Sequence, residues 1–488
     1  MCAGPWTYGS ARRARPCGAR PEAGTSAGRP ATPAGSRATT SGRPSTTRAP
    51  GRWPHSCAPS TRPRCAAEAW PGTSAPTDGT GGFVANIAVA SLGSRGDLFP
   101  LLGIGRSLRD RGHRVTVFEY SEYADDVTRT NLRFAPLGTG SACQEVFENS
   151  GETSQALSQL IRRVALPTAA EAARRIVAEG PFDVVIANHF QYGGQLAAEL
   201  LGVPLISVTG VDIVELYYPP AGASAEERAL AERTLRLVDR LGTPPLNAIR
   251  RELGLPERPH ASTLGSLSDD AVLVIVSELF LSGTDSWPDH FRIAGYPAYE
   301  GSDGLAVPPR VQRFVDRTDL GPLVICTLGD SWANDYPPTC AHLARLAQRL
   351  RFRVLYLVCR GRVDAEGEHC LVHQFAPLSR LLPQARAIVH HAGRGSLLTG
   401  MRAGVPALMI PHWLDGFENA RRAERLGVGR VVAPDLDPAA VSRAITELLG
   451  DEAYHVAARA AAARLAEDPD PGRVAEELVL GTVGSRSW

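Results

Sequence analysis

The sequence of 488 residues contains no lysine, so all 52 of its Lys-plus-Arg positions are arginine. Without lysine the chain cannot form the Schiff base on which pyridoxal-phosphate chemistry depends. It also lacks the standard phosphate-binding loop of nucleotide hydrolases, whose motif ends in Lys-Ser or Lys-Thr. No run of about 18 apolar residues occurs either, so no membrane span is expected.

The first 80 residues contain no Val, Ile, Leu or Phe, but hold 12 Pro and 11 Arg. Such a segment buries too little apolar surface to offset the loss of chain entropy, so residues 1–82 are expected to be disordered. Three acidic residues against 11 Arg give about +8, which leaves about −7 for the rest of a chain of net charge +1. An Arg-rich, acid-poor start is one mark of an organelle transit peptide. Because leucine and helical periodicity are absent, we favour a dispensable extension or an over-long reading of the gene.

Cysteine is scarce beyond residue 82, and no two cysteines have the CxxC spacing of a zinc site. These five residues are Cys143, Cys326, Cys340, Cys359 and Cys370. We expect reduced thiols in a cytoplasmic protein, without a disulfide framework. Two stretches, DLD (435–437) and DPD (468–470), match a DxD metal signature, but each precedes an Ala-rich helix and is expected to be a helix cap. We therefore expect no metal site, and no nucleic-acid partner.

What the remaining chain does contain is a βα pattern that runs twice. Apolar runs typical of buried parallel strands lie at 85–92, 114–120, 182–190, 203–210 and 271–277, and again at 322–329, 352–358, 385–391 and 406–412. The stretch 292–309 between them is rich in Gly and Pro, as in an interdomain linker. The pattern predicts an α/β protein of two doubly wound, Rossmann-like domains facing across a cleft at the carboxyl ends of their strands. We place the domains at 83–297 and 310–488, with 298–309 as the linker.

The stretch VHHAGRGS (389–396) places a Gly-rich turn between a predicted strand and a predicted helix. Backbone N–H groups at such a helix start favour an anion, because the helix dipole places about half a positive charge there. His391 has a donor for a phosphate oxygen, and Arg394 has a charged one. An ordinary strand-to-helix corner is the alternative, so the neighbouring sequence must decide.

The neighbouring sequence, AGVPALMIPHWLDGFENARRAERLGVG (403–429), completes a longer pattern. From His390 to Gly429 the chain resembles the donor-binding motif of family-1 glycosyltransferases of the GT-B fold, especially bacterial enzymes that decorate natural products and lipids. The stretches AGYPAYEG (294–301) and TLGDS (327–331) are also similar to that family. The resemblance covers residues 84–465.

The resemblance implies a role for individual residues. It assigns the donor diphosphate to Gly329, Ser331, His391, Gly393, Arg394, Gly395 and Ser396. Asp415 would bind hydroxyl groups of the donor sugar. Asp97, in GSRGDLFP (93–100), stands where the family has its catalytic base, which takes the proton of the acceptor hydroxyl. Asp97, followed by Pro100, also suits the N-cap position of a helix, and it can serve as both.

The chain departs from the family pattern at several positions. The family's Asp-Gln pair is Asp415-Gly416 here, so one sugar-binding side chain is missing and Glu418 is a candidate substitute. Arg394 replaces a small residue, and Asp330 brings a negative charge to the phosphate loop. Thr399 stands where plant relatives place a ribose-binding Glu. A deoxysugar donor would tolerate the loss of the Gln.

Acceptor recognition is expected from the loops of the first domain. NHFQYGG (188–194) and VDIVELYYPP (211–220) offer apolar and aromatic surface, with Asn188, His189 and Tyr217 as candidate acceptor-binding residues. Packing within the domain is the alternative for these aromatic residues. His113 lies in a helix-to-strand turn and is expected to be structural.

The resemblance implies an inverting, metal-independent transfer of a hexose or deoxyhexose from a UDP- or dTDP-linked donor to a hydroxyl group of a hydrophobic natural product or lipid. No further cofactor is expected. Two alternatives remain open, a nucleotide-sugar 2-epimerase on the same fold and a catalytically degenerate partner protein. The oligomeric state is also open, a homodimer included.

Overall fold

The computed structural model describes residues 83–140, 142–143, 145–146, 153–281, 283–284, 286–302, 304–327, 329, 336–358, 367–411, 414–433 and 437–484. The chain divides into two units, Met1–Gly72 and Thr73–Trp488, and all described residues belong to the second. The disorder expected for residues 1–82 concerns a segment outside the described residues.

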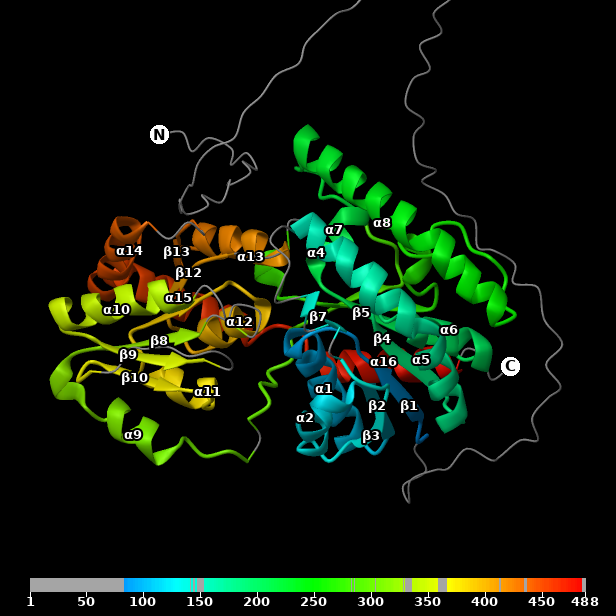
Figure 1. Cartoon of the computed structure of the whole chain (residues 1–488), viewed down its shortest axis with the longest axis horizontal. Coiled ribbons are helices and arrows are strands. Elements are labelled where there is room, and N and C mark those ends of the chain that lie inside the picture. Colours follow the sequence, from blue (N-terminus) through cyan, green and yellow to red (C-terminus); the bar gives the residue numbers. More distant parts are fainter. Residues whose placement is uncertain are drawn as a thin grey trace, which may run out of the picture. The chain divides into compact units, whose positions relative to one another are not determined.

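The first sheet has seven parallel strands in the order β3-β2-β1-β4-β5-β6-β7 (Figure 1). These are β1 (Asn86–Ala90), β2 (Arg114–Glu119), β3 (Arg133–Pro136), β4 (Val184–Asn188), β5 (Leu205–Thr209), β6 (Ala271–Ile275) and β7 (Phe291–Ala294). The central strands are nearly continuous apolar runs because a parallel sheet is buried on both faces. The helices of this part are α1 (Arg95–Asp110), α2 (Ala124–Thr128), α4 (Thr153–Leu160), α5 (Leu166–Glu179), α6 (Tyr192–Leu201), α7 (Val211–Tyr217) and α8 (Ala225–Glu252).

The second sheet has six parallel strands in the order β10-β9-β8-β11-β12-β13. These are β8 (Leu323–Thr327), β9 (Arg353–Leu357), β10 (Cys370–His373), β11 (Ala387–His390), β12 (Ala407–Met409) and β13 (Gly429–Val431). The helices that follow the linker are α9 (Pro309–Val315), α10 (Tyr336–Leu350), α11 (Leu378–Leu381), α12 (Arg394–Arg402), α13 (Leu414–Arg425), α14 (Pro438–Gly450), α15 (Glu452–Leu465) and α16 (Pro471–Gly484). Two doubly wound α/β domains are thus confirmed.

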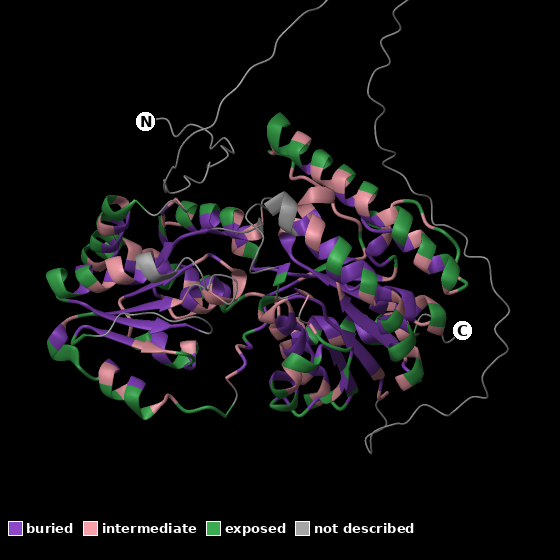
Figure 2. Cartoon of the chain, viewed as in Figure 1, coloured by how far each residue is buried: buried purple, intermediate pink, exposed green. Residues whose placement is uncertain are grey.

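Alternation along the strands distributes the core over both faces of each sheet. In β1, Ile87 and Val89 belong to one buried cluster, whereas Ala88 and Ala90 belong to another. Figure 2 shows the strands buried and the exposed residues on the outer helices. The four cysteines among the described residues are buried free thiols. No helix in the described ranges is long and apolar enough to cross a membrane.

The last helix, α16, differs from the boundary expected from the sequence. It packs on α1 of the first domain, where a Cβ on Gly472 would lie 1.9 Å from Oγ of Ser107. His113 joins this contact: its Nδ1 accepts from the backbone of Ala85 (3.1 Å), and its Nε2 lies 3.5 Å from Glu476 of α16. The buried His113 is therefore structural, as expected, and residues 471–484 extend the first domain.

Two other segments can be compared with the sequence-based prediction. The beginning of the stretch 292–309, expected to be linker, forms most of β7 at the sheet edge. Both aspartates that end a DxD stretch cap a helix: Asp437 accepts from the first turn of α14, and Asp470 accepts from the N–H of Arg473 in α16 (2.6 Å). No group of residues suited to a metal ion occurs in the described part of the chain.

Candidate active site

Two of the predicted site residues lie just after strands at which the strand order of a sheet reverses direction. In the first sheet the order changes between β1 and β4, and in the second between β8 and β11. Asp97 follows β1, and His391 follows β11. Because ligands of doubly wound folds bind outside the carboxyl ends of such strands, both positions suit a site. Ser331 and Asp330 lie outside the described residues, so their expected roles stay predictions.

The turn between β11 and α12 leaves a helix start without a side-chain cap. Gly393 is the N-cap residue, and no side chain accepts from the first turn of α12, which begins at Arg394. His390 is fully buried, its Nδ1 accepts from the N–H of Ala392 (2.9 Å), and burial lowers its pKa to about 3. The neutral His390 thus holds the turn that presents the backbone N–H groups from Gly393 to Ser396.

The ring of His391 lies between two glycines, one from each half of the switch point. A Cβ on Gly329 would lie 2.8 Å from Cε1 of His391, and a Cβ on Gly393 would lie 2.3 Å from its Nε2. Neither position has room for a side chain unless the ring moves. The two predicted diphosphate residues Gly329 and Gly393 therefore fix the orientation of the third, His391.

Asp97 is the third residue of α1 and forms a capping box with Ser94. Its Oδ2 accepts from the backbone N–H of Ser94 (2.8 Å) and from the Ser94 hydroxyl (3.0 Å). Burial raises the pKa of Asp97, although the bond from the Ser94 backbone and the charge of Arg394 oppose the shift. Gly93 precedes with a φ of +142°, and a Cβ there would lie 2.3 Å from Asp97 Oδ2. Asp97 is thus a helix cap in a position that also suits a base.

Asn188 ends β4, and the backbone of the loop after β1 engages its side chain. Its Oδ1 accepts from the N–H of Leu92 (3.1 Å), and its Nδ2 donates to the carbonyl of Leu92 (2.8 Å). This amide therefore links the two strands at the switch point and positions the loop that leads to Asp97. Binding of an acceptor by Asn188 stays a prediction.

His189 and Tyr217, the other predicted acceptor residues, contact each other. Tyr217 Oη lies 3.3 Å from Nε2 of His189, and Ser266 Oγ lies 3.5 Å from its Nδ1. Burial lowers the pKa of His189 to about 4, so the imidazole is neutral at physiological pH. His189 is buried and Tyr217 is half-buried, so Tyr217 offers more surface to a ligand.

Arg394 connects the two domains. Its Nη1 lies 2.9 Å from Asp212 of α7, and its Nε lies 3.3 Å from Asp415 of α13. A Cβ on Gly210 would lie 1.4 Å from Nη1, so only glycine leaves room for the guanidinium there. Neither Gly210 nor Asp212 was predicted as a site residue, because VDIVELYYPP (211–220) was interpreted for its apolar and aromatic residues alone. The guanidinium that was expected to bind phosphate thus pairs with two carboxylates here.

The first turn of α13 is fixed on the turn after β11. Asn419 donates to the carbonyl of Ala392 (3.2 Å) and to Oδ2 of Asp415 (3.0 Å). A Cβ on Gly416 would lie 3.1 Å from the carbonyl oxygen of His391, so a side chain at that position has little room. This close approach gives a physical reason for Gly416, the departure from the family's Asp-Gln pair.

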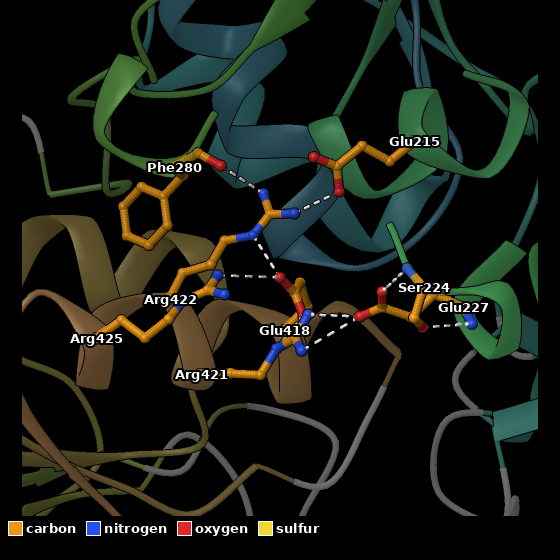
Figure 3. A network of polar contacts seen from close by, with 8 residues as sticks. All are labelled: Glu215, Ser224, Glu227, Phe280, Glu418, Arg421, Arg422 and Arg425. Atoms are coloured by element: carbon orange, nitrogen blue, oxygen red, sulfur yellow. Dashed lines mark hydrogen bonds and ion pairs between the residues drawn. The ribbon is translucent and has the colours of Figure 1, made fainter. Parts of the chain in front are cut away.

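Glu418, the candidate substitute for the missing Gln, belongs to an arginine network (Figure 3). It contacts Arg421 and Arg422 in α13, and Arg425 lies 3.7 Å from it. Arg422 also donates to Glu215 of α7 and to the carbonyl of Phe280 (2.7 Å). The carboxylate of Glu418 therefore supports a contact between the domains, and its role toward a donor sugar stays a prediction. Thr399 donates to the carbonyl of Gly395 (2.7 Å) within α12.

Two family models match the chain, one in each domain. Residues 87–209 match the glycosyltransferase family 28 N-terminal domain. Residues 368–480 match the C-terminal domain of the erythromycin biosynthesis protein CIII-like family.

Named relatives and solved structures agree with these matches. The chain is 28% identical over 413 residues to the L-demethylnoviosyl transferase of Streptomyces niveus, covering 80% of this chain and 97% of that protein. It is 26% identical over 412 residues to a sterol 3-beta-glucosyltransferase of Yarrowia lipolytica, covering 77% of this chain and 27% of that protein. The crystal structure of glycosyltransferase VinC in complex with dTDP superposes with a TM-score of 0.60 at 19% identity, covering 82% of this chain and 100% of that one.

The matches confirm the resemblance and the fold that it implied. Relatives named as glycosyltransferases cover nearly all of the described residues, so the chain is an enzyme that transfers a sugar. The two family models and the named relatives together support a family-1 glycosyltransferase of the GT-B fold.

Proposed function

We propose that this glycosyltransferase moves a hexose or deoxyhexose from a nucleoside-diphosphate sugar to a hydroxyl group of a hydrophobic small molecule, with inversion and without a metal ion. One observation carries the proposal. Arg394, the first residue of the uncapped helix α12, lies 2.9 Å from Asp212 of the domain that carries Asp97, and the charge of Arg394 lowers the pKa of Asp97. A base and an anion-binding helix start thus meet at one place.

The reaction would be a single displacement at the anomeric carbon. Asp97 takes the proton of the acceptor hydroxyl while its oxygen forms the new bond to that carbon. The bond to the diphosphate breaks, and the leaving group takes its electron pair. The backbone N–H groups at the start of α12, together with His391, would stabilise the negative charge that develops on the diphosphate. This positive surface needs neither a lysine nor a metal ion.

The donor and acceptor classes rest on the relatives and on the local sequence. The Streptomyces relative is named for the transfer of an L-demethylnoviosyl group, and the Yarrowia relative for the glucosylation of a sterol. Gly416 removes one side chain that would bind a sugar hydroxyl, which suits a deoxysugar donor. The VinC structure contains dTDP, so the activity assay should include both dTDP-linked and UDP-linked sugars.

The test compares Asp97→Asn with Asp110→Asn at the other end of α1. Asparagine keeps an acceptor for the Ser94 N–H but cannot take a proton, so turnover with dTDP- or UDP-sugars should fall by about 10²- to 10⁴-fold. Affinity for the free nucleotide should stay unchanged. Asp110 is exposed and pairs with Arg109, so its variant should behave as wild type. Near-normal turnover of Asp97→Asn would show that another group is the base.

Two further measurements test the stereochemistry and the metal. The anomeric configuration of the product, read by NMR, should be opposite to that of the donor. Turnover should be insensitive to EDTA. Retention of configuration, or loss of activity with EDTA, would overturn that part of the proposal.

A further inference from the structure

Tyr296, in the segment between β7 and the second domain, lies along helix α12. Its backbone carbonyl accepts from Arg402, the last residue of α12. Its hydroxyl is at the other end of the same helix, where it is the nearest atom, at 3.9 Å, to the Cβ position of Gly395. The side chain therefore reaches from the end of α12 to the start that presents its N–H groups.

Tyr296 is a buried residue that lies beside charged groups. The residue is 6% exposed, and among the described residues nothing donates to or accepts from its Oη. Burial raises the pKa of Tyr296 to about 12, although Arg394 lowers it and the carboxylates of Asp97 and Asp415 raise it. The phenol is therefore protonated at physiological pH, and its O–H group can donate to a bound ligand.

We propose that Tyr296 is a donor-positioning residue whose hydroxyl donates a hydrogen bond to a phosphate oxygen of the nucleoside-diphosphate sugar bound at the start of α12. This inference rests on the proposed function. A phosphate is the favoured partner because the hydroxyl faces the helix start at Gly395, where an anion is stabilised. A phosphate oxygen is also an acceptor only, which is what a protonated phenol requires.

The same segment offers a matched control. Tyr299 lies three residues further on and is 9% exposed, but its hydroxyl donates to the carbonyl of Asp126 in α2 (3.5 Å). Tyr296→Phe and Tyr299→Phe each remove one hydroxyl from the same buried segment. Only the first removes a group that faces the start of α12.

The experiment measures the Kd of the wild type and of both variants for UDP, dTDP and the two nucleosides without phosphate, by calorimetry with competition for weak ligands. For the diphosphate that the wild type prefers, Tyr296→Phe should raise the Kd about ten-fold or more, since a hydrogen bond to a charged group is lost. Its Kd for the matching nucleoside should stay within about two-fold, as should all values for Tyr299→Phe.

Each outcome separates the inference from the proposed function. A wild type that binds neither diphosphate contradicts the proposed function itself. If the wild type binds a diphosphate and the Tyr296→Phe variant binds it equally well, only the inference about Tyr296 is overturned. Equal losses for diphosphate and nucleoside in Tyr296→Phe also overturn it, because they show a general disturbance of the site.

Discussion

Replacing Arg422 by methionine tests whether the arginine network of Figure 3 holds the two domains together. The side chain of Arg422 is 4% exposed, and that of its partner Glu215 is 15% exposed. Methionine keeps most of the length but removes the charge. Glu418 keeps Arg421 as a partner (2.6 Å), whereas the other oxygen of Glu215, Oε1, is buried without a partner among the described residues. The variant thus leaves Glu215 buried and unpaired.

The expected cost follows from that burial. Removing one partner of a buried ion pair typically costs about 3–5 kcal/mol, because the remaining charge is uncompensated. For a domain of about 200 residues this lowers the melting temperature by about 7–12 °C. The neighbouring Arg421 is 54% exposed and lies 3.3 Å from the half-exposed Glu227, so Arg421→Met should cost less than about 1 kcal/mol. Melting curves of the two variants at pH 8 give the comparison.

The pH dependence identifies the cause. Burial already raises the pKa of Glu215, and Arg422 is the main group that lowers it. Without Arg422 the folded state binds a proton more tightly than the unfolded state, so the loss of stability is full above the folded pKa and shrinks as the pH falls toward the ordinary glutamate range. A small shift for Arg422→Met, equal to that of Arg421→Met, would refute the buried-pair argument. A large loss that is the same at pH 5 and pH 8 would refute the assignment to Glu215.

Three more predictions concern the site itself. Asp212→Asn removes a carboxylate that pairs with Arg394, so titration with dTDP or UDP should show binding about five-fold tighter and more sensitive to salt; unchanged affinity would contradict competition between Asp212 and the diphosphate. Gly393→Ala has an acceptable backbone at a φ of −61° but displaces the ring of His391, so the nucleotide Kd should rise about ten-fold with little change in melting temperature; equal affinity would show that the ring moves freely. The pH profile of kcat/KM should lose activity on the acid side with an apparent pKa above 3.8, because burial raises the pKa of Asp97 and the base must be ionised; a limb at or below that value would contradict the burial effect.

The parts of the fold that the sequence predicts well are those with a strong local signal. The runs in β1 (IAVA), β8 (LVIC) and β11 (AIV) are short but uninterrupted apolar stretches, so their burial in a parallel sheet follows from composition. The segment that forms β7 is short, is followed at once by Gly295 and Pro297, and joins only one neighbour at the sheet edge, so the stretch that begins there resembles a linker. The return of α16 to α1 could not be predicted, because an apolar stripe shows that a helix is covered but not which surface covers it.

In the candidate site, too, the features that depend on neighbouring residues could be predicted, whereas those that depend on distant residues could not. The start of α12 and the start of α1 each depend on a few residues of sequence. α12 begins at the Gly-rich turn as expected, whereas the N-cap of α1 is Ser94, and Asp97, expected to be the cap, is the third residue of the helix in a capping box with it. Arg394 is different, because 182 residues separate it from Asp212. From the sequence alone, the residues next to Arg394 predict only a cation at a phosphate-binding turn. Its actual neighbours depend on how two separately folded sheets meet.

That difference changes what Arg394 is able to do. An arginine free at the start of α12 would add a full positive charge to the diphosphate site. Paired with Asp212 and Asp415, the same arginine contributes little net charge, and any gain from a phosphate must replace interactions that it already makes. Under the proposed function, donor binding would therefore be coupled to the contact between the domains, since a ligand that draws Arg394 away from Asp212 also weakens that contact. No side chain accepts from the backbone N–H groups in the first turn of α12. In the proposed function these N–H groups, and not Arg394, would therefore bind the donor without first losing another partner.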